Sequence, residues 1–244
     1  MEKIRSKSNS SAAIKKLVVA AMFTALAFAS MFVMRINVIF LTFDAKDAIV
    51  TIAGLLLGPL YSLAISLTVS ILELVTVGDT GLWGFIMDFL STAVFSCSCA
   101  LIYKYKKNMK GAISGLISAV IAMTAFMLLF NLFIVPLYNP AYTTAAVATM
   151  VPTLFLPFNL TKGLLNSAIV LILYKPVSKA LKAVKILPKS DFSAPVGEDA
   201  KLRAKKNMAF SLTVTLIGFA VVAICLVIFF IFLDGDFMLV ENIK

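Results

Sequence analysis

Residues 48–77 read AIVTIAGLLLGPLYSLAISLTVSILELVTV, and the number of membrane crossings depends on how this stretch folds. A crossing helix needs only about 20 apolar residues, so the stretch is long for a single helix. It is interrupted by Gly58 and Pro59. This pair breaks helices, because proline lacks an amide donor and its ring clashes with the preceding turn. The stretch is therefore either one very long helix or two helices that turn at Gly58 and Pro59.

Apolar runs of this kind recur along the chain. The composition is 61% hydrophobic and 14% charged over 244 residues, a balance with which a soluble domain cannot cover its surface. Seven runs are present, at 17–34, 48–57, 60–77, 83–103, 112–135, 153–174 and 208–233. The run at 48–57 is too short to span a bilayer by itself. We therefore expect an all-α integral membrane protein.

The distribution of the basic residues indicates whether 48–77 forms one helix or two. All but four of the 22 lysines and arginines lie before the first run, after the fourth, or between the sixth and seventh; the exceptions are Arg35, Lys46, Lys162 and Lys244. Basic connections of membrane proteins face the cytoplasm. A single crossing over 48–77 would place the lysines of 104–110 outside, so two crossings are favoured. We expect a multi-pass protein of the cell membrane with a cytoplasmic N-terminus and an outer C-terminus.

These crossings divide the chain into four parts. We expect a basic cytoplasmic N-terminus at 1–16, a six-helix core at 17–187, a basic cytoplasmic linker at 188–207, and a further transmembrane helix with a short outer tail at 208–244. The linker is rich in charge, proline and serine. The seventh run has no acidic, basic or amide side chain, which predicts an anchor or a packing helix.

Polar side chains at membrane depth mark a candidate site, because each costs a few kcal/mol unless it is paired or faces water. The candidates are Glu73, Asp88, Asn131, Asn159, Lys162 and Asn166. Asn159, Lys162 and Asn166 follow the i, i+3, i+7 spacing that places side chains on one helix face. This set of donors and acceptors suits a neutral ligand with imide or hydroxyl groups. The alternative is hydrogen bonding between helices, with Lys162 paired to Asp88 or Asp44.

The connection at 35–47, RINVIFLTFDAKD, is unusually apolar for an outer loop. It is predicted to fold back over the membrane core, bringing Asp44 and Lys46 to the site. The alternative is an ordinary loop in which Asp47 caps the next helix. Trp83, the single tryptophan, lies where an interfacial aromatic residue is usual, and stacking on an aromatic ligand is the other interpretation.

The sequence lacks the residues that several kinds of metal, catalytic and nucleotide-binding site usually need. The chain has no histidine, and Cys97, Cys99 and Cys225 lie within apolar runs, so neither a metal site nor a disulfide is expected. A phosphate-binding loop of the G-x-x-x-x-G-K-[ST] type is also missing. These absences argue against an enzyme, and no cofactor is expected. A stand-alone ion-coupled transporter, with Glu73 or Asp88 as the proton carrier, is an alternative.

Six motifs occur in an order typical of one family: AMFTALAFA, LTFDAKD, LGPLYSL, GDTGLWGF, FNLFIVPLY and PFNLTKGLLNS. Over about residues 15–185 the chain resembles the riboflavin-specific substrate-binding (S) components of energy-coupling factor (ECF) transporters. The resemblance implies a six-helix core that captures riboflavin from outside and works with a transmembrane coupling subunit and two cytoplasmic ATPases. The seventh run departs from the six-helix pattern.

The resemblance also implies roles for particular residues. The ligand-binding set expected from the resemblance and from the polar residues above is Thr42, Asp44, Lys46, Trp83, Asp88, Asn131, Asn159 and Lys162. Ala21, Ala25 and Ala29 form a flat stripe on the first helix that lets another backbone approach closely. This stripe packs either within the chain or, as the resemblance implies, against the coupling subunit. An S component for another vitamin or a nucleobase-like solute is the second interpretation.

Overall fold

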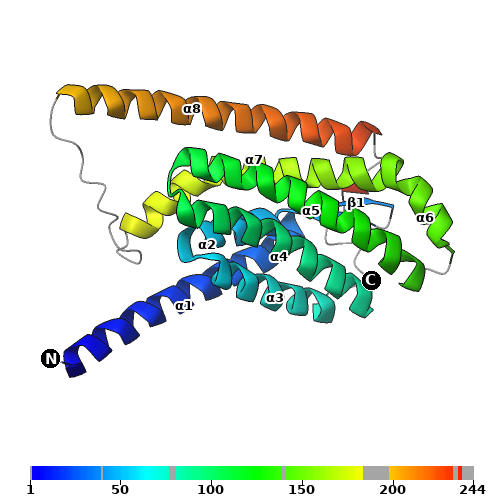
Figure 1. The fold of residues 1–244 in the computed structure, drawn as a ribbon, viewed down its shortest axis with the longest axis horizontal. Helices are drawn as coiled ribbons and strands as arrows, with labels where there is room; N and C mark the ends of the chain where they lie inside the picture. The colour runs from blue at the N-terminus through cyan, green and yellow to red at the C-terminus, as the bar shows by residue number, and fades with distance from the viewer. Residues whose placement is uncertain are drawn as a thin grey trace.

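The computed structural model describes residues 2–39, 41–76, 81–138, 141–183, 198–232 and 236–237 (Figure 1). Its helices are α1 (Glu2–Val33), α2 (Lys46–Leu57), α3 (Pro59–Thr76), α4 (Gly81–Tyr105), α5 (Met109–Tyr138), α6 (Thr144–Met150), α7 (Leu156–Ala183) and α8 (Glu198–Val227), with π-helical η1 (Val151–Phe155) and η2 (Ile228–Phe232). The strands are β1 (Arg35–Val38), β2 (Leu41–Asp44) and β3 (Asp236–Phe237). The chain is nearly all helical, which confirms the predicted fold class.

Within the described part of the chain, six helical stretches are long and apolar enough to cross a membrane. They are Ala13–Val33, Pro59–Thr76, Gly81–Tyr105, Met109–Leu137, Thr144–Leu181 and Leu212–Ile231. Together with α2 they correspond to the seven predicted runs. Helix α8 begins at Glu198, so the last part of the predicted linker at 188–207 is helical, while its first part lies outside the described residues.

The chain turns at Gly58 and Pro59, as the basic residues predicted. Gly58 has φ +108°, a conformation that side-chain-bearing residues rarely adopt, and its N–H donates to the Gly54 carbonyl at 2.8 Å. Helix α3 starts directly at Pro59. Lys46, at the start of α2, is ion-paired with Glu73, near the end of α3. The two helices are therefore antiparallel neighbours rather than one continuous helix.

Helix α2 has only 12 residues because protein, rather than lipid, surrounds it. Nearly all its side chains are buried, and its neighbours are α1, α3, α4 and α7. Gly54 permits the approach of α3, since a Cβ added there would lie 2.9 Å from the Ser62 Cβ. Backbone and polar side chains at membrane depth are tolerated where neighbouring helices enclose them. This enclosure explains how α2 carries Lys46, Asp47 and Thr51, each 0% exposed.

The segment after α1 forms a β-hairpin rather than an ordinary loop. Strands β1 and β2 are antiparallel, from Arg35 opposite Asp44 to Val38 opposite Leu41, and β3 pairs with the other edge of β1. Ile36, Val38 and Phe43 are fully buried. The apolar character of 35–47 therefore reflects a hairpin packed onto the bundle, which agrees with the predicted folding back over the core.

Helix α8 runs alongside α7, and its C-terminal end approaches β1 (Figure 1). The two helices are close, since a Cβ added at Gly218 would lie 3.1 Å from the Ile172 Cγ1. The predicted seventh segment is thus a packing helix that reaches the hairpin.

Replacing Gly54 tests the close contact between α2 and α3. We expect Gly54→Ala to lower the thermal unfolding midpoint in detergent, because the new Cβ overlaps Ser62 and overpacking costs about 1–3 kcal/mol. Ala64→Leu, which adds a larger side chain on the exposed face of α3, is the control and should leave the midpoint unchanged. Equal midpoints for the two variants would contradict the proposed packing.

Candidate ligand-binding pocket

A cavity of about 350 Å³ lies at the hairpin end of the bundle. Its walls come from the β1–β2 hairpin, α3, α4, α5 and α7. This volume falls at the small end of the range of about 300–1,000 Å³ that small-molecule sites occupy. Of the residues predicted to bind ligand, six line it: Thr42, Asp44, Asp88, Asn131, Asn159 and Lys162. Elements distant in sequence therefore converge on one cavity.

The pocket combines apolar and polar walls. Its apolar lining includes two aromatic rings, Phe85 and Phe158, and the side chains of Leu41, Leu74 and Met127. The polar lining holds carboxylates, amides, hydroxyls and two basic groups. Such a mixture favours a largely apolar ligand that carries a few groups able to form hydrogen bonds.

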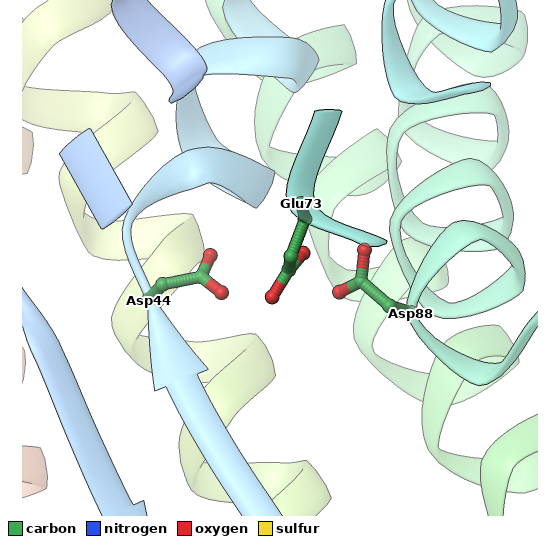
Figure 2. Close-up of side chains that lie close together, drawn as sticks. All are labelled: Asp44, Glu73 and Asp88. Atoms are coloured by element: carbon green, nitrogen blue, oxygen red, sulfur yellow. The ribbon is translucent and has the colours of Figure 1, made fainter. Parts of the chain in front are cut away.

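Three carboxylates meet at the edge of the pocket, from β2, α3 and α4. Figure 2 shows Asp44, Glu73 and Asp88 pointing toward one another. One carboxylate oxygen from each residue lies within 4.8 Å of one from each of the other two. The Lys46 Nζ lies 3.6 Å from Asp44 Oδ2 and 2.5 Å from Asp88 Oδ1, and it also pairs with Glu73. The Lys46 side chain is only 1% exposed and does not line the pocket. The buried ammonium group of Lys46 therefore forms ion pairs with β2, α3 and α4.

A second ion pair joins α7 to α2. The Lys162 Nζ lies 3.4 Å from Asp47 Oδ2, and Asp47 Oδ1 accepts a hydrogen bond from Thr92 Oγ1 at 2.6 Å. The interpretation that Lys162 pairs with Asp88 or Asp44 is therefore wrong. These two acids pair with Lys46 instead, because the first turn of α2 brings Lys46 between β2 and α4 and turns Asp47 toward α7.

The start of α2 is capped by neighbours rather than by Asp47. The helix begins at Lys46, so Asp47 lies in the first turn, and the prediction that it caps the helix is wrong. Asp44 Oδ1 accepts from the Lys46 N–H at 3.1 Å, and Asn166 Oδ1 accepts from the Ala48 N–H at 3.1 Å. Two of the free amide donors at a helix start are thus satisfied.

Asn131 and Asn159 present amides to the cavity from α5 and α7. Each is 2% exposed and donates from Nδ2 to a carbonyl one turn earlier, Met127 at 2.7 Å and Phe155 at 2.8 Å. An amide has two N–H donors and a carbonyl acceptor, so these bonds use only part of its capacity. Asn166 shares the helix face of Asn159 but caps α2 and does not line the pocket.

The sequence-based set includes two residues that the structure leaves outside the pocket, Lys46 and Trp83, and it misses others inside it. Trp83 is 37% exposed and does not line the cavity. Ser91 does, and its buried Oγ has no hydrogen-bond partner among the described residues. Asn37 and Ser70 also line it; Thr42 Oγ1 donates to Asn37 Oδ1 at 3.1 Å. The spacing of Ser91 from Asp88, one helical turn, is the signal that sequence reasoning overlooked.

Negative charge predominates around the two lysines, since four carboxylates face them. Asp44, in the hairpin, is fully enclosed, and this burial raises its pKa above the ordinary value although Lys46 acts in the opposite direction. Arg35, which also lines the pocket, lies opposite Asp44 in the hairpin register.

A multi-pass helical bundle that encloses a mixed polar and apolar pocket defines a membrane subunit that binds a small solute. Residues 15–174 match the family described as "ECF transporter, substrate-specific component", and the chain belongs to this family. Its members are transporter subunits rather than enzymes. The family role is substrate binding for transport in the cell membrane, in association with a coupling subunit and ATPases.

The solved structure described as "Structure and mechanism of the S component of a bacterial ECF transporter" is similar to this chain. The two share 29% sequence identity with a TM-score of 0.58, over 69% of this chain and 98% of the other. A comparison with curated protein sequences gives no match. Helix α8 lies beyond the residues that match the family.

Replacing Lys46 tests the three-way ion pair. Lys46→Met keeps an unbranched side chain but leaves three carboxylates without their cation, and breaking a buried ion pair costs about 3–5 kcal/mol. We expect a lower thermal unfolding midpoint in detergent at neutral pH. Lys104→Met, at an exposed position of α4, is the matched control. A midpoint for Lys46→Met equal to that of the control would show that the cluster contributes nothing to stability.

Proposed function

We propose that this chain captures riboflavin at the extracellular side and mediates its uptake with the coupling subunit and the ATPases. The observation that carries the proposal is the pocket, in which amides, a lysine and a serine with no hydrogen-bond partner among the described residues face aromatic and aliphatic walls. The six sequence motifs shared with riboflavin-specific S components support the same ligand.

The chemistry of riboflavin complements these walls. The vitamin is a neutral, flat and mostly apolar tricycle with an imide edge and a hydroxylated chain. Phe85 and Phe158 offer aromatic surface for the rings. The amides of Asn131 and Asn159 supply both donors and acceptors, as an imide edge requires. Thr42 is available to the hydroxylated chain.

The charge of the pocket favours the vitamin over its phosphorylated form. Asp44, Glu73 and Asp88 line the cavity, against Arg35 and Lys162 as basic groups. A phosphate group prefers a cluster of basic side chains and is repelled by carboxylates. We therefore assign the pocket to uncharged riboflavin.

The orientation of the chain follows from its basic connections. Asp88, which lines the pocket, lies near the start of α4, whereas Lys104 lies in its last turn, beside the lysines of 104–110. The pocket and this basic cluster are therefore at opposite ends of the bundle. Because basic connections face the cytoplasm, the pocket faces outward and the N-terminus lies inside.

The alanine stripe of α1 is the proposed contact with the coupling subunit. Ala21, Ala25 and Ala29 are all exposed, while Phe23 and Ala27 on the same helix are buried against the bundle. The stripe is thus free of contacts that would bury it within the described part of the chain. Small side chains on an exposed helix face let a second helix approach closely in lipid.

Flavin binding is the first test. Purified protein should show flavin absorbance or quench added riboflavin fluorescence, and Asn159→Ala should weaken binding at least tenfold, because a buried polar edge of the ligand loses its partner. Leu160→Ala, at a half-exposed neighbouring position, should bind like the unmodified chain. Riboflavin phosphate should compete poorly. Absence of binding at micromolar riboflavin would reject the flavin assignment and favour another vitamin or a nucleobase-like solute.

The partner surface has a separate test. Ala25→Leu should reduce copurification with the coupling subunit and abolish ATP-dependent riboflavin uptake, because the larger side chain prevents close helix approach. Riboflavin binding by the isolated chain should persist. Ala64→Leu, on the exposed face of α3, is the control. Normal assembly of the Ala25→Leu variant would place the coupling interface elsewhere.

A further inference from the structure

The end of α8 contacts the hairpin through an aromatic side chain. Phe229, in η2, is fully buried, and its ring centroid lies 5.3 Å from that of Phe43 in β2 and 5.7 Å from that of Phe158 in α7. Phe158 lines the pocket, and Phe43 lies between two pocket residues, Thr42 and Asp44. Phe229 is therefore one contact away from the cavity through Phe158, and through Phe43 it packs on the strand that supplies Thr42 and Asp44 to the cavity.

The backbone beyond α8 makes a second connection. Strand β3 pairs with β1, with Phe237 opposite Ile36 and Asp236 opposite Asn37. An isolated two-stranded hairpin is marginally stable at best, and a third strand adds to its stability. Because Asn37 lines the pocket, this pairing also fixes part of the cavity wall.

The buried residues form two separate hydrophobic clusters, and the hairpin belongs to the cluster that α8 completes. One cluster is centred on α1, α2 and α5, while the other contains Ile36, Val38 and Phe43 together with Cys225 and Phe229. The buried face of the hairpin thus belongs to a cluster with side chains of α5, α6, η1, α7 and the end of α8, rather than to the larger cluster around α2.

We propose that α8, η2 and β3 together form a brace for the binding pocket and that Phe229 is its principal positioning residue. The brace holds the β1–β2 hairpin against α7 and thereby limits how fast a ligand leaves and enters. It acts through Phe43, Phe158 and the pairing of β3 with β1, without touching the ligand. The use of riboflavin as a probe rests on the function proposed above. The effect of the brace on the hairpin is independent of that function.

Two neighbouring phenylalanines provide a matched test in the full-length chain. Phe229→Ala removes the buried ring, whereas Phe230→Ala changes a residue that is 43% exposed. In stopped-flow fluorescence, Phe229→Ala should raise the riboflavin dissociation rate about tenfold, and Phe230→Ala should leave it unchanged. Phe229→Leu, which refills much of the space, should restore a rate close to that of the unmodified chain.

A third variant separates positioning from general loosening of α8. Val214 is buried on α8 about 20 Å along the helix from Phe229. Val214→Ala should lower thermal stability without changing the dissociation rate. If Val214→Ala accelerates dissociation as much as Phe229→Ala does, α8 acts only through stability and the proposal is wrong.

Hydrogen exchange tests the brace without any ligand. Backbone amides of 35–44 should exchange several-fold faster in Phe229→Ala than in Phe230→Ala, while those of α2 should not change. Equal exchange in the two variants would overturn the brace. If the unmodified chain does not bind riboflavin but the exchange difference is present, the flavin assignment fails and the brace stands.

Discussion

The ammonium group of Lys46 joins β2, α3 and α4 at one buried point, and the rest of the site is arranged around it. Charged groups at membrane depth are stable only when they are paired. Asp44, Glu73 and Asp88 can therefore line a cavity inside the bundle because a single cation neutralises part of their charge. The same requirement explains why α2, which carries Lys46, is short and enclosed by other helices.

The first turn of α2 consequently contacts several of the elements that form the pocket. Asp47 pairs with Lys162, and Asn166 accepts from the Ala48 amide, so α7 is joined to α2 by two polar contacts. On α7, Asn159 faces the cavity while Asn166, two turns away, supports the helix start. Pocket-lining and structural positions thus occur along one polar face, and helical spacing alone does not distinguish them.

The helices could be predicted because the bilayer imposes local rules, namely apolar length, chain breaks such as Gly58–Pro59, and the side on which basic residues lie. The convergence of Asp88, Asn131, Asn159 and Lys162 followed from the same rules. The folding back of 35–47 over the core was predicted as well, but its strand pairing was not, because the sheet includes β3, which is distant in sequence. The partner of Lys162 was also beyond prediction, since the choice among Asp44, Asp47 and Asp88 depends on how α2 turns against α7.

Two kinds of interaction hold the walls of the pocket in place, and they differ in the free energy needed to separate them. On the side of α3 and α4, buried ion pairs hold the wall, and separating them would expose charge at membrane depth. On the side of the hairpin, aromatic packing by Phe229 and a short strand pairing hold it. Asp44 fixes one end of the hairpin to Lys46, while Ile39, at its turn, is 69% exposed. We therefore expect movement of the hairpin about this fixed end to cost less free energy than an opening between α3 and α4, and we infer that a ligand enters and leaves on the hairpin side.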